Sequence, residues 1–132
     1  MLDCSVSAAW CLHDETNDAA HRLLAVLGET EAMVPELWRP EMANVLAVAE
    51  RRGRIDQRDA EEAVSLLGRL PVRVVASEPD TMKRLVGLAR ETGLSAYDAS
   101  YLELALRLNL ALATFDEHLA KAAAAVGVAP GV

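Results

Sequence analysis

Several acidic residues stand at positions where an isolated negative charge is hard to explain: Asp3, Glu41, Asp98 and Asp116. Asp98 belongs to the stretch G-L-S-A-Y-D-A-S-Y-L-E-L-A, where helical spacing puts it on one face with Leu102 and Ala105. That face is expected to point into the protein. A carboxylate buried there must be paired, hydrogen-bonded or bound to a metal ion, because an isolated buried charge is very costly.

Short β-capable runs alternate with longer helical runs along the chain. Strands are expected at residues 1–4, 32–34, 72–75 and 110–114. Helices are expected at residues 6–12, 18–27 (capped by Asn17), 36–52, 57–70, 79–92, 96–108 and 115–125, and Val128 is expected to pair weakly at a sheet edge. The strands lack a polar–apolar alternation, which is typical of parallel strands buried on both faces. We therefore predict one domain over residues 1–132 with an α/β fold, a three-layer α/β/α sandwich with a short-stranded, mainly parallel central sheet.

This fold is expected to bring the four acids together. In open parallel sheets the binding crevice lies beyond the carboxyl ends of the strands. Asp3 lies at the end of the first predicted strand, and Asp116 follows the last one. Glu41 and Asp98 lie early in predicted helices. All four acids are therefore expected at the crevice. Four carboxylates cannot all stay ionised there without a compensating cation. Oxygen ligands of this kind suit Mg²⁺ or Mn²⁺, so we predict a divalent-metal site.

Helix capping is the alternative explanation for some of these acids. The motifs Ser95-x-x-Asp98 and Thr114-x-x-Glu117 resemble capping boxes, and acids in a first helical turn interact favourably with the helix dipole. Capping accounts for Asp98, but it hardly explains an acid in a strand, such as Asp3. The conjunction of all four acids favours the metal site.

Four short motifs resemble, in order and spacing, those of PIN domains, and most closely the VapC-type toxin ribonucleases of toxin–antitoxin pairs. The motifs are D-C-S at 3–5, E-M-A-N at 41–44, Y-D-A at 97–99 and T-F-D at 114–116, with A-V-G-V near the end. The resemblance covers nearly the whole chain and implies a metal-dependent endoribonuclease. It implies that the catalytic, metal-binding quartet is Asp3, Glu41, Asp98 and Asp116, with supporting positions at Ser5, Asn44 and Thr114. It also implies an RNA substrate, a cognate antitoxin protein as partner, and a homodimer.

Two features depart from the family pattern. The first predicted strand begins almost at Met1 and is short, so Asp3 is expected to be less firmly held than usual. Glu36 is an extra acid near Glu41 that could compete as the metal ligand. The Glu-x-x-Asn context favours Glu41.

The formal net charge of −7 argues against broad, sequence-blind binding to nucleic acid, which needs a basic surface. A nuclease with an acidic active site remains compatible with this charge. The candidates for RNA contact lie in the one basic cluster and beside Glu41: Arg51, Arg52, Arg54 and Arg39. Surface salt bridges to Glu50, Asp56 and Asp59 are the alternative role for the cluster.

Other functional classes lack support in the sequence. It has no dinucleotide-binding or P-loop motif and no plausible Ser/His/Asp or Cys/His set. The absence of a secretory signal and of a long apolar stretch, together with two cysteines expected to be reduced, predicts a cytoplasmic protein without membrane contact. Two other functions stay open, namely a PIN-like nuclease acting on DNA or structured flaps, and a catalytically silent PIN-like module for binding or dimerisation.

Overall fold

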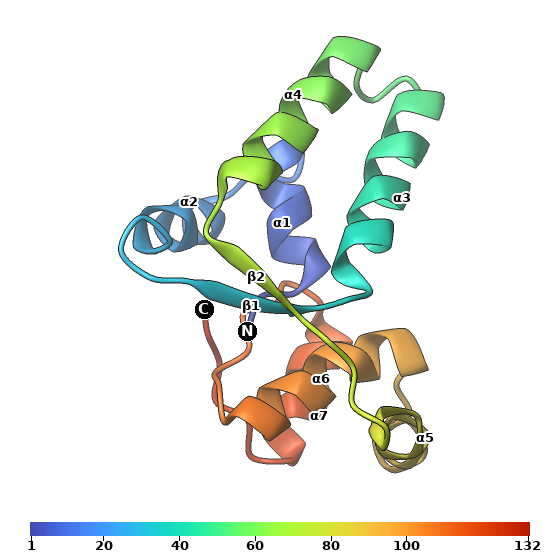
Figure 1. Ribbon diagram of the computed structural model, residues 1–132. Coiled ribbons are helices and arrows are strands. Elements are labelled where there is room, and N and C mark those ends of the chain that lie inside the picture. The colour runs from blue at the N-terminus through green and yellow to red at the C-terminus, as the bar shows by residue number, and fades with distance from the viewer.

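The computed structural model describes all 132 residues and has helices packed on both sides of a small parallel sheet (Figure 1). The strands are β1 (Ala32–Pro35) and β2 (Val72–Val75), which pair in parallel with Ala32 opposite Val72. The helices are α1 (Cys4–Cys11), α2 (Asp18–Val26), α3 (Trp38–Arg51), α4 (Gln57–Arg69), α5 (Thr81–Thr92), α6 (Ala96–Leu108) and α7 (Glu117–Ala125). Figure 1 shows α1, α3 and α4 on one side of the strands and α5, α6 and α7 on the other. The predicted α/β class with a parallel sheet is confirmed.

Backbone hydrogen bonds continue the pairing beyond β1 through three further segments. The N–H of Leu2 donates to the carbonyl of Met33 at 3.1 Å, and Leu2 forms a parallel bridge with Ala113. Leu112 forms a second parallel bridge with Pro130. Across the molecule the paired segments therefore follow the order 72–75, 32–35, 1–3, 112–113 and 129–131. The chain order reverses between 1–3 and 112–113, and such a reversal is where open α/β sheets bind their ligands.

Two of the predicted strands are almost absent. Residues 1–4 pair only around Leu2, because α1 already begins at Cys4, and residues 110–114 contribute only isolated bridges. The edge pairing was predicted at Val128 but lies at Pro130, while Val128 is buried in the core. The expectation that strands are buried on both faces is wrong for β2, whose residues are half-buried or exposed because it forms the edge of the sheet.

Helix boundaries follow the local signals closely. Helix α6 has the predicted bounds, Asn17 caps α2 by accepting the N–H of Ala20, and α5 is followed by Gly93 with φ of 74°. Helices α3, α5 and α7 each begin two residues later than predicted. For α7 the reason is that Asp116 is its N-cap and therefore precedes the first helical residue. No helix is long and apolar enough to cross a membrane.

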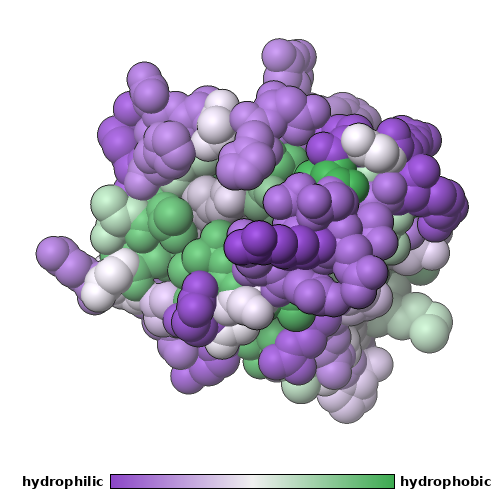
Figure 2. Space-filling view, turned by 90° about the horizontal axis from the view of Figure 1, so that it is seen from above, coloured by the Kyte–Doolittle hydropathy of each residue, from purple (hydrophilic) through white to green (hydrophobic).

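Helix α6 contains more buried residues than any other helix of the molecule. Tyr101, Leu102 and Leu104 are at most 1% exposed, and Ala99 and Ala105 are buried beside them. Tyr101 and Leu102 belong to the main apolar cluster, which also contains residues of β1, α1, α3 and α7. On the face seen from above in Figure 2, hydrophilic side chains dominate and apolar ones show mainly in the hollows between them. Asp98 therefore lies in the first turn of a helix that the core holds firmly in place.

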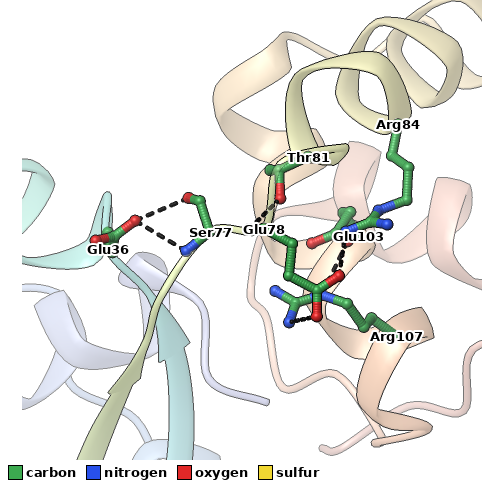
Figure 3. A network of polar contacts seen from close by, with 7 residues as sticks. All are labelled: Glu36, Ser77, Glu78, Thr81, Arg84, Glu103 and Arg107. Carbon is green, nitrogen blue, oxygen red and sulfur yellow. Dashed lines mark hydrogen bonds and ion pairs between the residues drawn. The ribbon is translucent and has the colours of Figure 1, made fainter.

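A buried acid on α6 joins this helix to its neighbours (Figure 3). Glu103 is 4% exposed, and its carboxylate accepts hydrogen bonds from Nε of Arg84 at 2.8 Å and Nε of Arg107 at 3.0 Å. Glu78 binds the same two guanidinium groups at 2.9 and 3.2 Å. Because Glu78 precedes α5, the network fastens the connection between β2 and α5 to α6.

Candidate functional site

The four acids predicted to form the site line one pocket of about 390 Å³. Asp3 and Asp116 are the N-caps of α1 and α7, and Glu41 and Asp98 lie in the first turns of α3 and α6. Four helix N-termini therefore contribute an acid to the same pocket. Each N-terminus carries a partial positive charge, which favours carboxylates at these positions. Ser5 and Asn44 line the pocket as well.

Asp3 is the most tightly held of the four acids. It is 5% exposed, and its Oδ1 accepts the N–H of Cys4 at 2.6 Å. Its Oδ2 accepts the hydroxyls of Ser5 at 2.6 Å and of Thr114 at 2.7 Å, and the N–H of Ser5 at 3.3 Å. The expectation that a short first strand holds Asp3 loosely is wrong, because the start of α1 and the two hydroxyls provide the restraint.

The same two hydroxyls connect Asp3 to the segment that carries Asp116. Ser5 Oγ accepts the N–H of Phe115 at 2.9 Å, and Thr114 Oγ1 accepts the N–H of Asp116 at 3.0 Å. These contacts give a physical basis for the supporting positions that the family resemblance assigns to Ser5 and Thr114. The predicted capping box beginning at Thr114 is not formed, since Asp116 itself caps α7.

Asp98 combines a capping contact with a place in the pocket. Ser95 is the N-cap of α6, accepting the N–H of Asp98 at 3.0 Å, and its hydroxyl donates to Asp98 Oδ2 at 2.7 Å. The capping interpretation is thus confirmed for Ser95. Asp98 is nevertheless half-buried at the pocket wall, so it lies at the edge of the buried face of α6 rather than within it. Capping and a functional role do not exclude each other here.

Glu41 is half-buried and receives one hydrogen bond, from the hydroxyl of Tyr101 to Oε2 at 2.5 Å. Burial raises the pKa of Glu41 above its ordinary value of 4.5, the bond from Tyr101 acts in the opposite direction, and the charges of Asp3 and Asp98 raise the pKa further. The net pKa is raised. The pocket therefore disfavours the ionised form of Glu41.

We expect ionisation of Glu41 to cost the metal-free protein stability as the pH rises above 4.5, so that Glu41→Gln gains stability relative to the wild type over this range. Because the pKa of Glu41 is raised in the folded state, this carboxyl group binds more protons in the folded protein than in the unfolded chain between its two pKa values. The contribution of Glu41 to stability therefore falls as the pH rises through that window. Urea unfolding in a chelator, from about pH 4 to about pH 8, measures the slope.

The matched control for this pH dependence is Glu117→Gln, which removes an exposed acid of α7 outside the pocket. This variant should keep the pH dependence of the wild type. Parallel stability curves for the wild type and Glu41→Gln across the window would contradict the assignment of the effect to Glu41.

Arg54 lines the pocket but is already engaged. Its guanidinium donates to both carboxylate oxygens of Asp14, the shortest contact being 2.9 Å, and to Glu15 at 2.8 Å. The alternative role, in which this arginine forms salt bridges, is confirmed. Its partners come from the turn after α1, however, and not from Glu50, Asp56 or Asp59. Sequence reasoning gave no signal for this pairing, because the partners lie about forty positions away.

The other candidate arginines take different places. Arg51 and Arg52 are exposed at the end of α3 and form no salt bridge. Arg39 is exposed and lines a separate, mainly apolar hollow between α3, α4 and β2. Arg39 is therefore adjacent to Glu41 in sequence but lies on another face of α3.

Two further residues are excluded from the chemistry. Glu36 accepts the N–H of Ser77 at 3.0 Å and its hydroxyl at 2.8 Å, and it lines a different, small cavity, so it does not compete with Glu41 (Figure 3). Burial and then the charges of Glu41 and Asp3 raise the pKa of Cys4, which lines the acidic pocket. Its thiol stays protonated and is a poor nucleophile.

The donor atoms of the pocket fit a hard divalent cation in type, since carboxylate oxygens are what Mg²⁺ and Mn²⁺ prefer. As the side chains stand, no group of three or more His, Cys, Asp or Glu residues is arranged to hold a metal ion. The carboxylates share the pocket without converging on one point. Ligation would require side-chain rotation, and Asp116 is the exposed member of the four.

Comparison with known proteins defines the class. The family described as PIN domain matches residues 1–125, so the chain belongs to the PIN-domain family. It is 29% identical to Ribonuclease VapC3 of Pyrobaculum aerophilum, covering 92% of both chains. It is 34% identical to Ribonuclease VapC9 of Mycobacterium tuberculosis, covering 77% of this chain and 85% of the relative. The crystal structure of PAE2754 from Pyrobaculum aerophilum is similar with a TM-score of 0.66 and 26% identity, covering 92% of this chain and 76% of the other.

The resemblance expected from the four motifs is thereby confirmed. The relatives are named as VapC ribonucleases and match most of the chain, which supports a PIN-domain toxin ribonuclease.

Proposed function

We propose that this chain is a Mg²⁺- or Mn²⁺-dependent endoribonuclease that hydrolyses RNA phosphodiester bonds in the pocket of four carboxylates. The proposed catalytic, metal-binding residues are Asp3, Glu41, Asp98 and Asp116. The observation that carries the proposal is that these acids, from four separate helix starts, line one pocket. The ribonuclease names of the relatives favour RNA over DNA as the substrate.

In this proposal a bound divalent ion supplies Lewis-acid activation of water and neutralises charge on the scissile phosphate. The residues of the chain would hold this ion and orient the carboxylates that bind it. Asp3, restrained by Ser5 and Thr114, presents a carboxylate that needs little reorganisation. Asp98 and Asp116 complete the ligand set from the more open side. The chain supplies no nucleophilic side chain, and none is needed when water attacks phosphorus.

RNA contact is proposed for the basic residues that are free of carboxylates. Arg51 and Arg52 are exposed and unpaired, so they can meet phosphates without first breaking an ion pair. Arg54 is nearer the acids, but it must leave Asp14 and Glu15 to do so. Arg39 is the weakest candidate, because it lies by another hollow. Asn44, exposed at the pocket wall, is proposed as a polar contact there.

We further propose that residues 1–132 act as a single nuclease domain, that the chain is the toxin of a toxin–antitoxin pair, and that it forms a homodimer. The VapC names of the relatives support the antitoxin partner. Growth arrest on expression, relieved by co-expression of a cognate antitoxin, is the corresponding cellular observation.

Metal removal tests the proposed function directly. We expect the purified protein to cleave single-stranded RNA with Mg²⁺ or Mn²⁺ and to lose at least about 100-fold in rate in a chelator, since the metal supplies several kcal/mol of transition-state stabilisation. Adding Mn²⁺ in excess should restore cleavage. Undiminished cleavage in the chelator would contradict metal dependence, and equal cleavage of DNA of the same sequence would contradict the RNA assignment.

A further inference from the structure

Tyr101 reaches the acidic pocket from the interior of the protein. Its side chain is 0% exposed, and it lies three residues after Asp98, so both project from the same side of α6. Its hydroxyl donates to Glu41 Oε2 at 2.5 Å, joining α6 to α3. A fully buried phenol needs a hydrogen-bond partner, and Glu41 is the one that this hydroxyl has.

The carboxylates of Glu41, Asp98 and Asp116 each accept a single hydrogen bond, and only that of Glu41 comes from another helix. Asp3 accepts four hydrogen bonds, Asp98 is held by Ser95, and Asp116 is held by a backbone N–H of its own helix. The carboxylate of Glu41 accepts one, from Tyr101, and its Oε1 has no partner. A glutamate side chain has several rotatable bonds, and restricting them costs conformational entropy that must be met by specific contacts.

We propose that Tyr101 is a positioning residue that holds the Glu41 carboxylate through Oε2 and leaves Oε1 as the oxygen available to a divalent cation. This inference rests on the proposed function and adds to it a residue outside the four acids. Carboxylates that bind metals are themselves hydrogen-bonded, and loss of such a partner typically weakens metal affinity or activity by about 10- to 100-fold.

The variant Tyr101→Phe tests the proposal, because it removes the hydroxyl and keeps the buried ring. Calorimetric titration of the full-length protein with Mn²⁺ should show affinity about 10-fold weaker than wild type. The Mn²⁺ concentration for half-maximal RNA cleavage should rise by a similar factor, and cleavage should recover at high Mn²⁺. The matched control is Tyr97→Phe on the same helix, where the side chain is 67% exposed and the Mn²⁺ affinity should stay unchanged.

A second variant separates positioning from a general structural role. Glu41→Asp keeps a carboxylate but withdraws it from the hydroxyl, so adding Tyr101→Phe to it should weaken Mn²⁺ binding little further. Three outcomes would overturn the inference. The effects of the two substitutions could add in the double variant, or Tyr101→Phe could bind Mn²⁺ as tightly as the wild type. The third is a loss of cleavage in Tyr101→Phe that high Mn²⁺ does not restore. If the wild-type protein itself fails to bind Mn²⁺, the proposed metal site falls together with the inference.

Discussion

Asp98→Asn is expected to reduce RNA cleavage by at least about 100-fold while the protein stays folded. The substitution removes a negative charge from the pocket but keeps the size of the side chain. The amide oxygen of the new asparagine would still accept the hydroxyl of Ser95, so the cap of α6 survives. Asp98 is half-buried and not a core residue, which makes a large loss of stability unexpected. Single-turnover cleavage of a labelled RNA measures the rate, and circular dichroism reports the fold.

The control for this experiment is Glu117→Gln. Glu117 follows Asp116 directly but is exposed, paired only with Lys121 at 3.5 Å, and outside the pocket. Its substitution should leave cleavage near the wild-type rate. If the preparation of Asp98→Asn cleaves as fast as the wild type, the activity comes from a contaminant or from another site.

Glu103→Ala is expected to lower the free energy of unfolding by about 2–3 kcal/mol. The substitution removes two charge-assisted hydrogen bonds to Arg84 and Arg107 and empties a buried position on α6. The loss stays below the upper range for a broken buried ion pair, because both arginines keep Glu78 as a partner (Figure 3). Denaturant unfolding at neutral pH measures this loss of free energy, provided that the dependence of the unfolding free energy on denaturant concentration is the same for both proteins.

Two further variants serve as comparisons for Glu103→Ala. Glu103→Gln keeps an acceptor oxygen for the arginines and should lose less than the alanine variant. Glu62→Ala removes an exposed i,i+4 partner of Arg58 and should change stability by less than about 0.5 kcal/mol. A Glu103→Ala protein as stable as the Glu62→Ala protein would show that the buried network contributes little to the fold.

Local features of the fold were predictable from sequence because they depend on neighbouring residues. The bounds of α6 follow from its apolar spacing and from Ser95, and the cap at Asn17 uses the N–H of a residue three positions away. Gly93 ends α5 in the left-handed conformation that glycine adopts without steric cost. The four acids were likewise recognisable as a set from their types and order, and all four line one pocket.

The family motifs pointed to Ser5 and Thr114 as supporting positions, but only the tertiary structure decided which atoms contact which acid. The hydroxyl of Tyr101 reaches Glu41 across 60 positions, and that of Thr114 reaches Asp3 across 111. Tertiary structure also decided the extent of the sheet. The segments around Leu2 and Leu112 form only isolated bridges, and the start of α1 interrupts the first of them. Strand β2 lies half-exposed at the edge of the sheet. Hydrogen bonds between distant residues depend on how helices pack around one another, and residue type and local spacing carry no information about that packing.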